Sequence, residues 1–109
     1  MEPASELEIT PLFPARLPKG TELAGHVVDG WLRDGGMAAI YRARRASDGA
    51  RMALKLQLPS TTRSAEICQR FDREAEAMRR VVGEPHIVEL HAAGVLDDGR
   101  RYFVMEWVE

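Results

Sequence analysis

Arg51-Met52-Ala53-Leu54-Lys55-Leu56-Gln57-Leu58-Pro59 is the stretch of this sequence that decides the fold. Its residues alternate between two sides, which is typical of a β-strand because successive side chains of a strand point to opposite faces of the sheet. One face holds Met52, Leu54, Leu56 and Leu58, and the other holds Ala53, Lys55 and Gln57. Pro59 ends the strand, since proline has no amide hydrogen to donate to a neighbouring strand.

After this strand the apolar residues recur with a helical period, and we predict one helix from Ser64 to Val82. Ser64 is a suitable N-cap, and Gly83 follows the helix as a suitable C-cap. The apolar stripe of this helix consists of Ile67, Phe71, Met78 and Val81. Glu74 falls inside the stripe, where an isolated carboxylate facing a sheet would cost several kcal/mol. Glu74 therefore requires a cationic partner or a wet cleft.

Lys55 is the matching anomaly on the strand. The chain contains 15 basic residues, of which the only lysines are Lys19 and Lys55. Lysine is a slim point charge that can reach past its neighbours into a cleft, whereas arginine presents a broad planar fork. A strand lysine opposite a helix glutamate suggests a charge pair that serves a ligand. The alternative is that Lys55 extends its charged end to water and Glu74 marks only the edge of the stripe.

Four further strands are expected, joined by turns rich in glycine and aspartate. We predict strands over residues 23–32, 37–45, 87–93 and 100–106. The turns contain Gly35-Gly36, residues 46–49 and Asp97-Asp98-Gly99. The sequence thus predicts an α+β fold, a five-stranded antiparallel sheet with one main helix in the order β-β-β-α-β-β. Residues 1–19 contain four prolines and few apolar residues, which favours a flexible leader ahead of a domain over 20–109.

Composition excludes several classes of protein. Fifteen basic residues balance 17 acidic ones at a pI of about 5.9, which disfavours nucleic-acid and membrane-surface partners. No run approaches the ~18 apolar residues of a transmembrane helix, and the acidic start differs from a signal peptide. We therefore expect a cytoplasmic chain. The single Cys68 forms no internal disulfide, and no cluster of cysteine and histidine has zinc-binding spacing, so no metal site is expected in this chain.

Taken together, five segments resemble, in order and at suitable spacing, the amino-terminal lobe of protein kinases, specifically bacterial serine/threonine kinases of the eukaryotic-like type. The segments are Leu32-Arg33-Asp34-Gly35-Gly36-Met37-Ala38-Ala39-Ile40-Tyr41 for the glycine-rich loop, Met52-Ala53-Leu54-Lys55 for the lysine strand, Arg70-Phe71-Asp72-Arg73-Glu74-Ala75 for the glutamate helix, Glu84-Pro85-His86-Ile87-Val88 before the fourth strand, and Tyr102-Phe103-Val104-Met105-Glu106-Trp107-Val108-Glu109 for the fifth strand and hinge.

The resemblance implies an ATP site. Lys55 would bind the α and β phosphates, and Glu74 would orient Lys55 through an ion pair. The glycine-rich loop, with Gly35 and Gly36, would cover the phosphates. For the adenine, the resemblance implies Leu32, Ile40 and Ala53 as the roof, Met105 as the gatekeeper, and the backbone groups of Glu106 and Val108 as partners of the adenine edge. Arg33 and Ala38 depart from the family, because they stand where the first and third glycines of the loop are usual.

The chain ends in the segment that resembles the hinge. In the family, the catalytic aspartate, the Mg²⁺ ligands and the surface for the protein substrate lie in the larger lobe beyond the hinge. We therefore expect the 109-residue chain to be an ATP-binding part of a kinase that transfers no phosphate by itself. The alternatives are a pseudokinase-like binding module and an unrelated β-rich domain.

Overall fold

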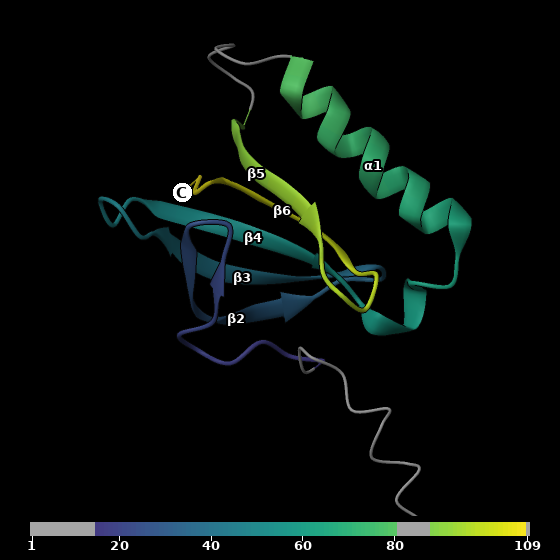
Figure 1. Ribbon diagram of the computed structural model, residues 1–109, viewed down its shortest axis with the longest axis horizontal. Helices are drawn as coiled ribbons and strands as arrows, with labels where there is room; N and C mark the ends of the chain where they lie inside the picture. The colour runs from purple at the N-terminus through teal and green to yellow at the C-terminus, as the bar shows by residue number, and fades with distance from the viewer. Residues whose placement is uncertain (1–14, 81–87, 109) are drawn as a thin grey trace, which may run out of the picture.

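The computed structural model describes residues 15–80 and 88–108 of the chain. Its elements are β1 (Glu22–Leu23), β2 (His26–Asp34), β3 (Ala38–Arg45), β4 (Arg51–Gln57), a short 3-10 helix (Pro59–Thr61), α1 (Ala65–Arg80), β5 (Leu90–Val95) and β6 (Arg101–Glu106). The strands form one antiparallel sheet in the order β1-β2-β3-β4-β6-β5, and α1 packs along β6 and β5 (Figure 1). The predicted α+β architecture with one main helix on an antiparallel sheet is confirmed.

The number of strands differs from the prediction, because the sheet has six strands and not five. The first predicted strand is divided at Ala24-Gly25, where both residues have positive φ, at 50° and 79°. Leu23 pairs with His26, so Ala24 and Gly25 between them form a tight hairpin turn of the kind that requires positive φ at both central positions. Alanine seldom adopts this conformation, and for this reason Ala24-Gly25 was not predicted as a turn.

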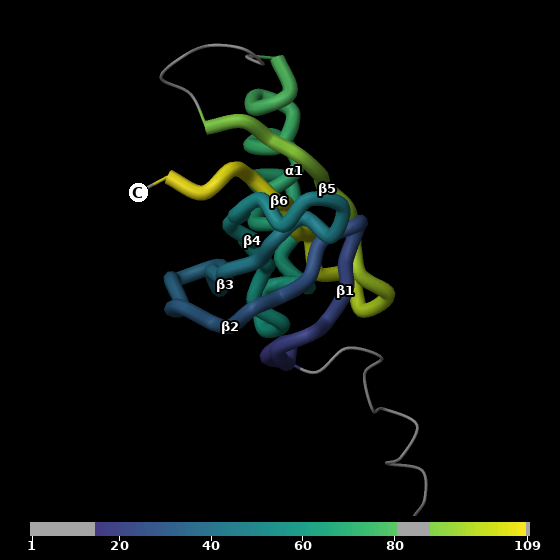
Figure 2. Tube along the Cα trace, turned by 90° about the vertical axis from the view of Figure 1, so that its left-hand side faces the viewer, coloured from purple at the N-terminus to yellow at the C-terminus, as the bar shows by residue number. Residues whose placement is uncertain are grey.

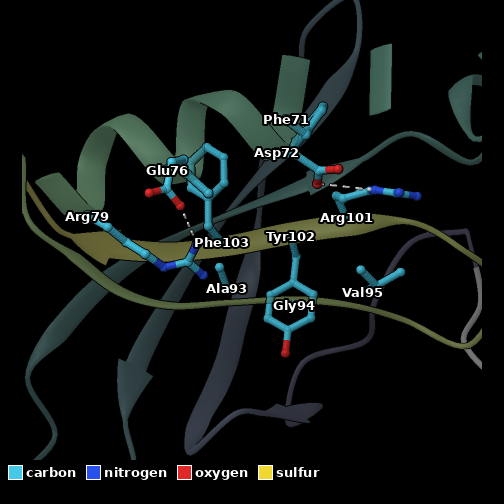
Figure 3. A pocket seen from close by; sticks show the side chains of 11 residues that line it. Phe71, Asp72, Glu76, Arg79, Ala93, Gly94, Val95, Arg101, Tyr102 and Phe103 are labelled. Carbon is cyan, nitrogen blue, oxygen red and sulfur yellow. Dashed lines mark hydrogen bonds and ion pairs between the residues drawn. The ribbon is translucent and has the colours of Figure 1, made fainter. Parts of the chain in front are cut away.

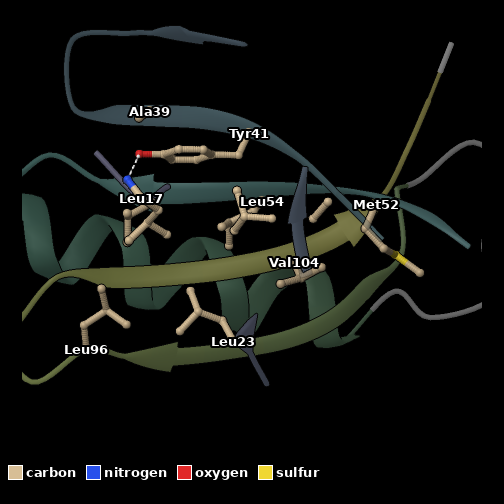
Figure 4. Close-up of a cluster of buried hydrophobic side chains, with 11 residues drawn as sticks. Leu17, Leu23, Ala39, Tyr41, Met52, Leu54, Leu96 and Val104 are labelled. Carbon is tan, nitrogen blue, oxygen red and sulfur yellow. Dashed lines mark hydrogen bonds between the residues drawn. The ribbon is translucent and has the colours of Figure 1, made fainter. Parts of the chain in front are cut away.

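The alternation of β4 is confirmed and separates two faces of the sheet. Met52, Leu54 and Leu56 are at most 2% exposed and belong to the main core. Figure 2 shows the sheet curling around its interior, and Figure 4 shows the side chains of this core, to which Tyr41 and Val104 also contribute. The opposite face of the sheet carries α1 and, beside it, the candidate site.

The helix joins the sheet through a second, smaller core. Phe71 and Ala75 of α1 pack on Phe103 and Ala38, and the rings of Phe71 and Phe103 lie 6.0 Å apart between centroids. The predicted N-cap is confirmed, because the Ser64 Oγ accepts a hydrogen bond from the Ile67 amide at 3.2 Å. The predicted end of the helix at Val82, and the stripe residue Val81, lie outside the described residues.

The predicted turn between the last two strands is present, although β5 begins three residues later than expected. The Gly99 amide donates to the Leu96 carbonyl at 2.9 Å, and Gly99 has a φ of 93°. Strand β6 matches its predicted range to within one residue.

The described part of the predicted leader packs on the sheet. Leu17 is 2% exposed, and its amide donates to the buried Tyr41 hydroxyl at 3.1 Å (Figure 4). The Ala15 carbonyl accepts a hydrogen bond from the guanidinium of Arg100 at 2.9 Å. Leu17 therefore belongs to the main core, although the residues on either side of it are exposed.

Candidate functional site

Lys55 and Glu74 form an ion pair between β4 and α1. The Lys55 Nζ lies 3.3 Å from Glu74 Oε1 and 3.5 Å from Oε2. The same Nζ lies 5.7 Å from the centre of the Phe71 ring and 5.5 Å from that of Phe103, within the range of cation–π attraction. The structure thus brings together the two charges that the sequence singled out.

The fold accounts for this approach. Lys55 is paired in register with Ile40 on one side and Phe103 on the other, so its side chain leaves the sheet on the face that carries α1. Phe71 lies one helical turn before Glu74 and anchors α1 on Phe103. Glu74 is consequently held at the edge of the helix–sheet contact, above Lys55.

Solvent reaches both members of the pair. The side chain of Lys55 is 28% exposed and that of Glu74 is 48% exposed. An ion pair this open contributes little to the free energy of unfolding, because water screens the attraction and ordering the side chains costs entropy. Glu74 therefore has the cationic partner that was expected, at the exposed edge of the helix stripe. The pair is better suited to orienting Lys55 than to stabilising the fold.

The ion pair lies in a cavity of about 260 Å³ beneath the turn between β2 and β3. The cavity is lined by Arg33, Gly35, Gly36, Met37, Ala38, Ile40, Lys55, Arg70, Phe71 and Glu74. Three of these side chains are cationic and one is anionic, which makes the cavity suitable for an anionic ligand. Its volume is close to the lower end of the range for small-molecule sites.

The β2–β3 turn is held at its ends by backbone hydrogen bonds. The Gly35 amide donates to the Ala38 carbonyl at 2.7 Å, and the Leu58 amide donates to the Met37 carbonyl at 2.9 Å. Asp34, next to the turn, accepts a hydrogen bond from the Trp31 indole at 2.8 Å and lies 3.5 Å from the guanidinium of Arg16. The carboxylate nearest the turn is therefore engaged by Arg16 and Trp31.

The remaining site residues of the sequence analysis lie at different distances from the cavity. Ala53 and Met105 are direct cross-strand partners on the face of Lys55, in the row next to it. Leu32 lies at an irregularity of β2, between Trp31 and Arg33, and does not line the cavity. Glu106 ends β6, and Val108 beyond it is 64% exposed.

Three features of the site were missed by sequence reasoning. Arg33 and Arg70 line the cavity, although the sequence analysis gave neither of them a role in the site. The side chain of Glu106 also has a structural role, since its Oε1 accepts a hydrogen bond from the Glu89 amide at 2.9 Å. The role of Arg70 could have been predicted from the sequence, because Arg70 lies one helical turn before Glu74 and therefore on the same side of the helix. The roles of Arg33 and Glu106 depend on the register of the strands.

A second cavity, of about 300 Å³, lies between α1 and the β5–β6 hairpin (Figure 3). It contains none of the site residues expected from the sequence. Arg101 and Asp72 form an ion pair at 3.4 Å at its rim, and Arg79 and Glu76 form another at 3.6 Å. The ring of Tyr102 lies over Gly94, where an added Cβ would come within 2.7 Å of the hydroxyl.

Within residues 15–80 and 88–108, no three histidine, cysteine or carboxylate side chains come close enough together to hold a metal ion. The one α-helix of the described chain is not long and apolar enough to cross a membrane.

Comparison with known proteins relates this geometry to kinases. No family model matches the sequence. Over 73 residues the chain is 38% identical to the serine/threonine-protein kinase PknK of Mycobacterium tuberculosis. The matched segment covers 67% of this chain and 6% of PknK. The kinase PknF of the same organism is 33% identical over 93 residues, covering 85% of this chain and 19% of PknF. The crystal structure of the Mycobacterium tuberculosis PknI kinase domain matches with a TM-score of 0.68 and 30% identity, over 85% of this chain and 37% of that one.

This chain is a protein-kinase amino-terminal lobe. The lobe spans less than a fifth of the length of PknK or PknF. Four of the five segments that resembled kinase motifs have places in it: the glycine-rich loop is the β2–β3 turn, the lysine strand is β4, the glutamate helix is α1, and the last segment contains most of β6. Residues 84–87 of the remaining segment lie outside the described residues.

Proposed function

We propose that this kinase lobe binds ATP in the cavity beneath the β2–β3 turn and is the nucleotide-binding part of a cytoplasmic serine/threonine protein kinase. The observation that carries the proposal is the Lys55–Glu74 ion pair, 3.3 Å long, which lines that cavity. A half-exposed ion pair adds little to the free energy of unfolding, so stability does not explain why two charges lie beside Phe71 and Phe103. Holding the Lys55 ammonium in position for a phosphate group does explain it.

Each element of the lobe has a role in the proposal. Lys55 binds the α and β phosphates, and Glu74 holds the ammonium group over the cavity. Gly35 and Gly36 let the turn come close to the phosphates. The cavity holds the phosphates, and the adenine extends beyond it from Ile40, which lines the cavity, to Leu32, Ala53 and Met105, which do not. The edge of the adenine pairs with backbone groups of Glu106 and Val108.

ATP requires Mg²⁺ in phosphoryl transfer, where the ion bridges and neutralises the phosphates. The described residues include no group of ligands for it. Because the kinase family carries the Mg²⁺ ligands, the catalytic aspartate and the surface for the protein substrate in its larger lobe, we place them there and expect the 109-residue chain alone to transfer no phosphate.

The test is a titration of the chain with Mg-ATP, followed by nuclear magnetic resonance because the affinity of a single lobe is expected to be weak. Lys55→Met should weaken binding about tenfold or more, the equivalent of one charge-assisted hydrogen bond to phosphate. Lys19→Met is the matched control, because Lys19 is the other lysine of the chain, is exposed and lies outside the cavity.

Circular dichroism should show that both variants remain folded, as expected for side chains that reach solvent. Equal ATP binding by Lys55→Met and the unaltered chain would refute the role of Lys55. A folded chain that binds no ATP would instead support a pseudokinase-like interaction module. Phosphate transfer from ATP by the chain alone would contradict the assignment of catalysis to a larger lobe.

A further inference from the structure

We propose that Arg33 is a specificity-determining residue of this cavity: its guanidinium binds the polyphosphate of the nucleotide and makes the lobe prefer nucleoside di- and triphosphates to monophosphates. This inference rests on the proposed function and deepens it. Arg33 stands where the first glycine of the loop is usual, so this chain has a cationic side chain at a position where the family usually has none.

Strand register places Arg33 on the same face as Lys55. Arg33 pairs with Ile40, Ile40 pairs with Lys55, and Lys55 pairs with Phe103, so the four residues form one row across β2, β3, β4 and β6. Cross-strand partners share a face of the sheet. Arg33 and Lys55 are two strands apart, roughly 10 Å between backbones. Two long side chains at that spacing can converge on one polyphosphate, and both line the cavity.

A bulge in β2 is responsible for this register. Trp31 pairs with Tyr41, but the next pair along the ladder is Arg33 with Ile40, so the strand contains one extra residue at Leu32. Without the bulge, Leu32 would stand opposite Ile40, and Arg33 would pair with Ala39 on the core face. The bulge therefore moves the guanidinium from the core side of the sheet to the cavity side.

The charge of Arg33 has no partner in residues 15–80 and 88–108, and this distinguishes it from the other cations of the cavity. Lys55 is paired with Glu74 at 3.3 Å, and Arg70 lies 3.4 Å from Glu66. The neighbouring carboxylate, Asp34, points to Arg16 and Trp31 instead. A guanidinium at the wall of a cavity with no partner among the described residues is well suited to a phosphate, which it can bind through two hydrogen bonds.

The backbone of the turn offers less than the loop of the family implies. The Gly35 amide is already bonded to the Ala38 carbonyl, at 2.7 Å, so it is not available to a phosphate. The third glycine of the loop is replaced by Ala38. A side-chain cation at position 33 can supply the donors that this backbone amide does not.

The experiment measures the binding of ATP, ADP, AMP and inorganic tripolyphosphate to the chain and to Arg33→Gly, Arg33→Ala and Arg33→Lys. Arg33→Gly separates two roles of Arg33, because they predict opposite changes in ATP affinity. The variant should bind ATP more tightly if Arg33 only obstructs the loop, and more weakly if Arg33 binds phosphate. We expect Arg33→Gly and Arg33→Ala to bind ATP, ADP and tripolyphosphate about tenfold more weakly than the unaltered chain. Their affinity for AMP should fall less than about twofold. Arg33→Lys should have an intermediate affinity for ATP, ADP and tripolyphosphate.

Arg73→Ala is the matched control, because Arg73 is an exposed arginine of α1 outside the cavity. Unchanged or tighter ATP binding by Arg33→Gly would overturn the inference, as would an equal loss for ATP and AMP. If Lys55→Met weakens ATP binding and the Arg33 variants do not, this inference fails while the proposed function stands. If the unaltered chain binds neither ATP nor tripolyphosphate, both fail.

Discussion

Gln57 offers a direct test of how the helix is joined to the sheet. Its side chain is fully buried at the end of β4, at 0% exposure. The Gln57 Oε1 accepts a hydrogen bond from the Arg101 amide at 2.9 Å, and the Nε2 donates to the Thr61 carbonyl at 3.2 Å. The Nε2 also lies 3.4 Å from the Cys68 Sγ in the first turn of α1. One side chain thus links β4, β6 and the segment that leads into the helix.

The replacement Gln57→Leu keeps the approximate volume of the side chain and removes these hydrogen bonds. No large cavity forms, so the cost comes mainly from the Arg101 amide, which loses its acceptor. The Thr61 carbonyl keeps a second hydrogen bond, from the Ser64 amide at 3.1 Å. A backbone amide left without a partner in a part-buried place costs about 1–3 kcal/mol, and the apolar leucine recovers part of this. We expect a net loss of about 1–2 kcal/mol, a sizeable part of the roughly 5–15 kcal/mol that stabilises a typical domain.

The assay is urea unfolding followed by circular dichroism and by tryptophan fluorescence. Gln69→Leu is the control, since Gln69 is exposed on α1, and we expect its free energy of unfolding to change by less than about 0.5 kcal/mol. If Gln57→Leu changes stability no more than Gln69→Leu does, the hydrogen bonds of Gln57 contribute nothing measurable to stability and the reasoning is refuted.

Three other predictions concern stability. The pKa of the Asp48 carboxyl is lowered to about 2, mainly by the hydrogen bond from Arg45 and also by that from the Ala50 amide. The chain should therefore lose stability as the pH falls from about 4 toward 2 and this carboxyl takes up a proton. The acid unfolding curve of Asp48→Asn should lack this loss. Tyr41→Phe leaves a buried backbone amide without its acceptor and should lower the free energy of unfolding by about 1–2 kcal/mol in urea; an unchanged midpoint would contradict that hydrogen bond. Ser64→Ala removes the cap of α1 and should cost about 1 kcal/mol, with Ser64→Asp restoring it in thermal unfolding.

The parts of the fold that could be predicted are those that short-range patterns determine. The alternation of Met52, Leu54 and Leu56 is sufficient to predict both faces of β4, and Ser64 predicts the start of the helix. The two charges out of pattern, Lys55 and Glu74, predicted an ion pair between strand and helix, and the structure brings them to 3.3 Å. Their role in a site came from the resemblance to kinases, because solvent reaches both side chains and their burial alone does not require a ligand.

The missed features depend on register or on distant contacts. The division of the first strand relies on a positive φ at Ala24, which alanine seldom adopts. Leu17 lies among prolines, and only its contact with a tyrosine far along the chain shows that it is buried. Arg33 reaches the cavity through a bulge that shifts β2 by one residue, and composition contains no sign of such a shift.

The two faces of β3 and β4 have a consequence for how this sequence can change over time. Alternate residues of these strands serve different tasks, since Tyr41 and Leu54 fill the core while Ile40 and Lys55 line the cavity. Replacing one residue can alter one task and leave the other intact. Deleting or inserting a single residue exchanges the two faces, so core and cavity would be lost together. Substitutions are therefore tolerable inside these strands, whereas changes of length are tolerable only in turns such as residues 46–49.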